Sequence, residues 1–288
     1  MAKPRSGPDP NEIIERLRRH LTVLGLTQID QRLDDHLAWA TRERPAPSEL
    51  LERVLGEQAE LRRDRRVERR IVHSGLPQRK TLEAFEWNFQ PGLDRSLMVE
   101  LGGLEWVRRA EDLIVTGKSG TGKSHLLMAF ALRACEQGLS VRYARGVDAL
   151  DDLHAGLADG TYAQRLKRWC SPSLLILDDV GLGQVKQREH EPTAAHTLFN
   201  LIDRRHTRVS TAVSSNLKLS EWGKYLGDAT LAAAILDRLS MRALRVDIDG
   251  PSYRQHEGRA RAKGRGGVAP DAPSTPSDPD DSGKPDKP

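Results

Sequence analysis

The N-terminal part of the chain carries apolar residues at the spacing of amphipathic helices. A first helix is expected between a cap at Asn11 and a stop at Gly25, since apolar residues recur there every three or four positions, at Ile13, Ile14, Leu17, Leu21 and Leu24. A second helix is expected over residues 28–41. A third should follow Pro45 and Pro47, with Ser48 as its cap and an apolar stripe of Leu51, Val54, Leu55 and Leu61. The pattern predicts a small helical domain over residues 1–79, suited to contact with DNA or a partner.

From Leu113 onward the pattern changes to short apolar runs separated by helical stretches. The runs cover residues 113–116, 141–143, 174–177, 211–214 and 244–248. Apolar strands that alternate with helices are typical of an α/β fold, in which helices cover both faces of a parallel sheet. We therefore expect a second domain over residues 80–257. Residues 258–288 are first rich in Arg and Gly, then in Pro, Asp and Ser, which predicts a disordered tail.

Composition narrows the class of protein. Apolar residues make up 38% of the 288 residues and charged residues 30%, with a net charge of only +4, so the position of the charges matters more than their sum. The two cysteines, Cys135 and Cys170, have no metal-ligand spacing and fit a reducing compartment. No apolar run approaches the roughly 20 residues that span a bilayer, so a soluble, cytoplasmic protein without a membrane contact is expected.

The strongest chemical signal is an octapeptide of the pattern G-x-x-x-x-G-K-[ST], which follows one predicted strand and opens a helix. We call it the phosphate loop; its members are Gly117, Lys118, Ser119, Gly120, Thr121, Gly122, Lys123 and Ser124. Glycines let successive backbone N–H groups turn inward around an anion, and the following helix adds the positive end of its dipole. Lys123 would contact the β- and γ-phosphates of ATP, and the Ser124 hydroxyl would bind Mg²⁺.

Two further polar signals follow apolar strands. Asp178 and Asp179 come after residues 174–177, at the edge of the sheet where α/β folds bind ligands. Asp178 could hold Mg²⁺ and Asp179 could orient or deprotonate the attacking water, although a helix-capping role is the ordinary alternative. Asn216 ends the next apolar run and could contact the γ-phosphate or the water, or it could be a simple turn residue.

Several segments resemble IstB, the insertion-sequence helper ATPase, which is itself similar to the DnaC helicase loader. The resemblance runs from about Asp34 to Arg254 and includes the segments KTLEAFEW (80–87), STAVSSNLKLSEWG (210–223), LAAAILDRL (231–239) and GPSYR (250–254). It implies an AAA+ core with sheet order 5-1-4-3-2, ATP-dependent assembly on duplex DNA as a homo-oligomer, and cooperation with a transposase.

The resemblance also implies roles for single residues. The phosphate loop matches Walker A, Asp178 and Asp179 match Walker B, and Asn216 matches sensor 1. Arg238 stands where an arginine finger would reach the ATP of a neighbouring subunit. Many AAA+ proteins have Glu where this chain has Asp179. Because Asp is shorter by one methylene group, the sequence supports ATP binding more firmly than ATP hydrolysis.

A basic segment follows the third predicted helix's apolar stripe. Residues 61–80 hold eight basic and two acidic residues, and helical spacing groups Arg62, Arg65, Arg66 and Arg69 along one side. Such a row could track DNA phosphates, or it could be a solvated face paired with acids. A second basic run, at Arg259, Arg261, Lys263 and Arg265, resembles a flexible nucleic-acid arm.

The sequence thus favours an ATP-dependent, DNA-binding ATPase that assists transposition. A replicative helicase loader in DNA replication would use the same ATPase core, and a switch that binds ATP with little hydrolysis is the third reading. A small-molecule kinase does not account for the basic segment or for the Asn216 and Arg238 positions.

Overall fold

The computed structural model describes residues 9–182 and 193–258. The predicted tail from residue 259 onward, including its basic run, lies outside them. In the part of the chain that the model describes, no helix combines the length and the apolar character needed to cross a bilayer.

Four helices form the N-terminal part: α1 (Pro10–Val23), α2 (Thr27–Gln31), α3 (Leu33–Glu43) and α4 (Pro47–Ser74). Three expected boundaries were wrong. Asp9, not Asn11, caps α1, because Pro10 fits the first helical position and the Asp9 side chain accepts the Asn11 N–H at 3.0 Å. The expected helix over 28–41 is split at Arg32. Ser48 does not cap α4, which follows Ala46, whose N–H donates to the Glu49 carboxylate at 3.0 Å.

The core of this helical part is small. Leu21, Ile29 and Leu33 are buried together, with Val54 of α4 packed against them. The predicted stripe on α4 is largely solvent-facing instead: the exposed fractions of Leu51 and Leu55 are 58% and 54%. An amphipathic pattern specifies an apolar face but not whether another element covers it.

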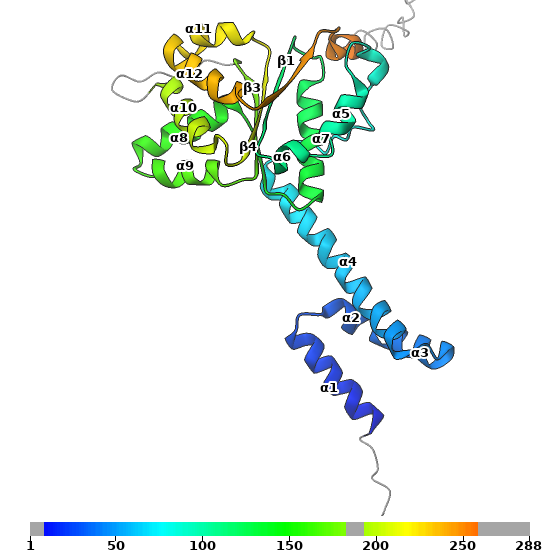
Figure 1. Cartoon of the computed structure of the whole chain (residues 1–288). Coiled ribbons are helices and arrows are strands. Elements are labelled where there is room, and N and C mark those ends of the chain that lie inside the picture. Colours follow the sequence, from blue (N-terminus) through cyan, green and yellow to red (C-terminus); the bar gives the residue numbers. More distant parts are fainter. Residues whose placement is uncertain (1–8, 183–192, 259–288) are drawn as a thin grey trace, which may run out of the picture.

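Helix α4 is one continuous element of 28 residues that joins the helical part to the sheet (Figure 1). Its last turns pack into the main core through Val67 and Ile71, which contact residues around α7 and β2. It ends where Gly75 adopts the left-handed φ of +73° that favours glycine. The domain boundary at residue 79 remains a prediction.

The five predicted strands all form, as one parallel sheet. They are β1 (Asp112–Gly117), β2 (Val141–Arg145), β3 (Leu174–Val180), β4 (Ser210–Ser215) and β5 (Ala243–Ile248). Their order is β2-β3-β4-β1-β5, which from the other edge reads 5-1-4-3-2. The predicted AAA+ α/β fold is therefore confirmed.

Helices cover both faces of the sheet (Figure 1). One face carries α5 (Arg95–Leu101), α6 (Glu105–Arg108) and α7 (Lys123–Glu136), preceded by the short η1 (Trp87–Phe89). The other carries α8 (Gly146–Ala158), α9 (Tyr162–Cys170), α10 (Ala194–Arg205), α11 (Trp222–Leu226) and α12 (Ala229–Ser240), with η2 (Leu219–Glu221) before α11. The central strands β1, β3 and β4 are buried on both faces over most of their length, whereas the edge strands β2 and β5 alternate between buried and more exposed positions.

Two buried charged residues, Arg205 and Asp112, link chain segments at the edge of the sheet where the strands begin. The Arg205 guanidinium is 1% exposed and donates to five uncharged oxygens, those of Trp169, Cys170, Pro172, Ser210 and Thr211. Asp112 begins β1 and accepts the Thr211 N–H at 2.7 Å. Burial raises the pKa of Asp112 to about 6, against the lowering effects of the Thr211 N–H and of Arg205.

This shifted pKa predicts a pH-dependent stability. Since the folded carboxyl binds its proton more tightly than the unfolded one, stability falls as pH rises from about 4 to about 6 and stays level above. Asn keeps an acceptor for the Thr211 N–H but does not titrate. From pH 4 to pH 7, the unfolding free energy of Asp112→Asn should rise relative to wild type by about 2–3 kcal/mol in denaturant titrations. The adjacent Glu111→Gln is the control, and parallel curves for Asp112→Asn and wild type would contradict the assignment.

Candidate nucleotide-binding site

The phosphate loop connects β1, which ends at Gly117, to α7, which begins at Lys123. Gly120 and Gly122 have φ angles of +82° and +102°, in the region that glycine adopts without strain. A Cβ on Gly122 would lie 2.6 Å from a ring carbon of Phe85, so this close approach also requires glycine. The loop thereby presents backbone N–H groups beside the N-terminus of α7, a geometry that binds phosphate.

Lys123 is buried under the loop, with only 4% of its surface exposed. Its Nζ donates to the carbonyl oxygens of Gly117 and Lys118 at 2.7 and 2.8 Å, which leaves the third donor of the ammonium for a phosphate. Burial lowers the pKa of Lys123, while the charges of Asp179 and Asp178 act in the opposite direction. Lys118 is different, because its side chain is exposed and lies 3.5 Å from the Asp249 carboxylate.

The two predicted carboxylates lie on β3 and differ in their surroundings. Asp178 is 4% exposed, and its two oxygens accept hydroxyl hydrogen bonds from Ser214 of β4 and Tyr143 of β2. Asp179 is half-buried and has a left-handed φ of +52°. Burial and the neighbouring Asp178 raise the pKa of Asp179. Because the left-handed region favours Asp and Asn over longer side chains, the backbone offers a physical reason for Asp at this position.

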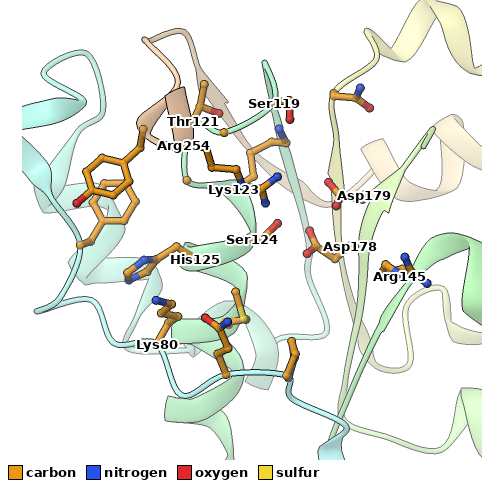
Figure 2. A pocket seen from close by; sticks show the side chains of 18 of the residues that line it. Lys80, Ser119, Thr121, Lys123, Ser124, His125, Arg145, Asp178, Asp179 and Arg254 are labelled. Atoms are coloured by element: carbon orange, nitrogen blue, oxygen red, sulfur yellow. The ribbon is translucent and has the colours of Figure 1, made fainter. Parts of the chain in front are cut away.

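These residues meet in one cavity of about 830 Å³ (Figure 2). Ser119 to Ser124 form one wall, and Asp178, Asp179 and Asn216 face them from β3 and the end of β4. The side-chain oxygen of Asn216 is buried and accepts no hydrogen bond from the described residues. The oxygens of Ser124 and Asp178 are the hard ligands that Mg²⁺ prefers, so the donor set fits this ion. The structure thus brings together the predicted phosphate, metal and water positions.

The last described segment adds a residue that sequence reasoning missed. Arg254 lines the cavity beside Lys123 (Figure 2). Its charge adds to the effect of burial in lowering the pKa of Lys123, and it partly opposes the rise that burial and Asp178 cause in the pKa of Asp179. The Tyr253 N–H donates to the carbonyl oxygen of Gly120 at 2.9 Å, so this segment is fastened to the phosphate loop. The GPSYR motif was visible in the sequence, but nothing local to it indicates that it returns to this loop.

Aromatic side chains line the cavity beside the phosphate loop. The Phe85 ring lies 5.2 Å from the His125 ring, and the Phe89 ring lies 5.1 Å from that of Tyr253, both centroid to centroid and edge to face. Burial lowers the pKa of His125, whose Nε2 lies 2.9 Å from the Thr81 oxygen. These aromatic rings suit the flat base of a nucleotide, and the adjoining phosphate loop suits its phosphates.

Two sets of predicted residues lie elsewhere. Arg238 is on α12, where its Nε is 2.5 Å from the Asp203 carboxylate and its guanidinium lies 4.5 Å from the Phe199 ring centroid. It does not line the cavity. The four arginines of α4, at positions 62, 65, 66 and 69, are all exposed on that helix.

Comparison with known proteins identifies relatives of this chain. The family model described as "IstB-like ATP binding protein" matches residues 19–261. The ATP-binding protein of insertion sequence IS21 from Pseudomonas aeruginosa is 34% identical over 83% of this chain and 88% of its own length. That of insertion sequence IS5376 from Geobacillus stearothermophilus is 30% identical over 85% and 96%. These names state ATP binding and an insertion sequence as the source.

The likeness to solved structures is weaker. The crystal structure of a DNA replication initiation factor gives a TM-score of 0.49 with 20% identity, over 67% of this chain and 56% of that one. The crystal structure of the DnaI gives 0.46 with 20% identity, over 60% and 90%. At these TM-scores and identities, the solved structures give no information on the function of this chain.

Lys123→Ala is expected to weaken ATP binding by about 100-fold or more, because a buried, charge-assisted contact to the phosphates is lost. Lys118→Ala is the matched control, since it removes the same charge from the exposed side of the same loop. It should change the dissociation constant by less than about threefold. Isothermal titration with ATP measures both, and equal losses in the two variants would contradict the assignment of Lys123.

Proposed function

Since the chain belongs to the family of IstB-like ATP-binding proteins, we propose that it hydrolyses ATP, assembles on duplex DNA and assists a transposase. The observation that carries this proposal is the single cavity in which the phosphate loop, two strand-end acids and Asn216 face one another. The insertion-sequence origin of the relatives supports a transposase as the partner over a replicative helicase.

The residues divide the chemistry among them. Lys123 and the N–H groups of the loop would hold the phosphates, and Ser124 with Asp178 would hold Mg²⁺, which supplies positive charge to the phosphate oxygens. Asp179 would orient the attacking water and accept its proton, and its raised pKa makes it a better base than an exposed Asp. Asn216, whose buried side-chain oxygen has no partner among residues 9–182 and 193–258, would complete the position of the water.

The surface of α4 supports binding to DNA phosphates. Within residues 9–182 and 193–258, no ion pair involves Arg62, Arg65 or Arg66. The nearby acid Glu68 pairs with Arg79 instead. The row is therefore not neutralised by its own helix. A row of exposed, unpaired arginines binds a polyanion mainly through released counterions, which makes the binding strong at low salt and indifferent to sequence.

Arg238 supports assembly into a homo-oligomer. It lies outside the cavity of its own subunit, and its side chain is 29% exposed. From there it would act on the nucleotide of an adjacent subunit, where a fixed guanidinium charge stabilises the transferring phosphoryl group. The alternative is a structural link between α10 and α12 through Asp203.

The DNA proposal predicts a salt dependence. Replacing Arg62, Arg65, Arg66 and Arg69 by Gln should reduce the slope of log affinity against log salt by up to about 3–4 for a random duplex, because each lost phosphate contact removes about 0.9. Fluorescence anisotropy at several salt concentrations measures it. A charge-matched control replaces Arg16, Arg19, Arg204 and Arg208, which are equally exposed. If both variants flatten the slope alike, the binding is a general effect of charge.

The oligomer proposal is tested by mixing. Arg238→Ala should bind ATP normally and lose about 1,000-fold or more in hydrolysis, as is typical of arginine fingers. An equimolar mixture with Lys123→Ala should recover part of the activity, since some interfaces then pair an intact pocket with an intact Arg238.

Asp203→Ala is the control that separates the two roles of Arg238. It breaks the same ion pair but keeps the guanidinium, so it should keep hydrolysis if Arg238 acts in trans. Equal losses of activity in Asp203→Ala and Arg238→Ala, with no recovery on mixing, would show that the pair is structural.

A further inference from the structure

The β3–β4 ladder is interrupted beside the candidate catalytic acids. The two strands pair in register from Leu174–Ser210 to Leu177–Val213, and pairing resumes only at Val180–Ser215. Asp178 and Asp179 occupy the gap. An interruption of this kind leaves backbone groups without their regular partners and re-aims the side chains it contains.

Two serine side chains of β4 replace the missing ladder bonds. The Asp179 N–H donates to Ser214 Oγ at 2.8 Å, and Ser215 Oγ donates to the Val180 carbonyl oxygen at 2.6 Å. Both serines are completely buried. Their buried hydroxyls thus satisfy the Asp179 N–H and the Val180 carbonyl oxygen in place of ladder partners.

Ser214 contacts both acids at once. Its hydroxyl donates to one carboxylate oxygen of Asp178 while accepting the Asp179 N–H, which uses its single donor and one of its acceptor sites. The other oxygen of Asp178 is held by the Tyr143 hydroxyl. One side chain therefore fixes the carboxylate of the first acid and the backbone of the second.

Ser215 extends the same connection to Asn216. Its Oγ accepts the Leu217 N–H at 3.1 Å while donating to Val180. Ser215 Oγ therefore connects Leu217, which follows Asn216, to Val180, which follows Asp179. The left-handed backbone of Asp179 costs about 1–2 kcal/mol and persists only where its surroundings hold it.

We infer that Ser214 and Ser215 are positioning residues that hold Asp178, Asp179 and Asn216 in one arrangement for metal and water binding. The inference rests on the proposed function for the roles of the three residues. It adds that the metal dependence of nucleotide binding is set by a hydroxyl on β4 that is completely buried.

The test measures ATP affinity with and without Mg²⁺ in the full chain. In Ser214→Ala, the factor by which Mg²⁺ strengthens ATP binding should fall about tenfold or more, while affinity in EDTA stays within about twofold of wild type. Ser210→Ala is the matched control, since Ser210 is equally buried at the opposite end of β4, with its hydroxyl 3.4 Å from the Trp106 and Val107 oxygens. It should leave both affinities unchanged.

Hydrogen exchange provides a readout that needs neither ATP nor metal. Backbone amides of residues 177–181 should exchange at least about tenfold faster in Ser214→Ala, with β1 unchanged, because the Asp179 N–H loses its acceptor. Ser214→Cys fills the site with a slightly larger side chain of the same branching and a weak hydrogen-bonding group, and it should change both readouts in the same direction. It serves as the test if the alanine variant does not fold.

The outcomes separate the two hypotheses. Equal losses of affinity with and without Mg²⁺, or unchanged exchange at residues 177–181, would overturn the positioning role of Ser214. If the wild type binds ATP as tightly in EDTA as with Mg²⁺, the proposed function is wrong about the metal, and Ser214 cannot set a metal dependence. Exchange then decides whether the serines hold the bulge.

Discussion

Three charged side chains are buried or half-buried at the carboxyl edge of the sheet, and the structure around them is arranged to make this tolerable. Lys123, Asp178 and Asp179 would each be costly to bury alone. Two loop carbonyls contact the ammonium, two hydroxyls contact Asp178, and the opposite charges lie across one cavity. The glycines of the loop, the interruption in β3 and the serines of β4 all follow from this requirement.

The two edges of the sheet bury charge in different ways, and the difference indicates which edge binds a ligand. At the amino edge, each of the three nitrogens of Arg205 donates to oxygens of its own chain, so all three are bonded within the protein. At the carboxyl edge, one donor of Lys123 and the oxygen of Asn216 remain open toward a cavity. Saturated polar groups stabilise a fold, whereas buried groups with capacity left over are suited to binding.

Sequence reasoning succeeded where the physical signal is local. The strands were predicted because each contains a short apolar run, longest in the central strands that are buried on both faces. The phosphate loop was predicted because its glycines, lysine and helix start are adjacent in the chain. It failed where the answer depends on distant residues. Whether Leu51 is covered depends on other helices, and the left-handed backbone of Asp179 depends on a serine 35 residues away. Arg254 reaches the cavity only because the chain returns to Gly120 at its last described segment.

Helix α4 has a mechanical consequence. Its last turns are held in the core through Ile71, while its N-terminal half carries the other N-terminal helices at the opposite end, through Val54 (Figure 1). From Ile71 to Pro47 the axis spans about 36 Å at 1.5 Å per residue. A tilt of about 5° at the clamp therefore displaces the far end by about 3 Å, close to the rise of two residues along the axis. The helix acts as a lever whose short end packs on α7, the helix that begins at Lys123. A sub-ångström shift of α7 is therefore magnified several-fold at the N-terminal helices.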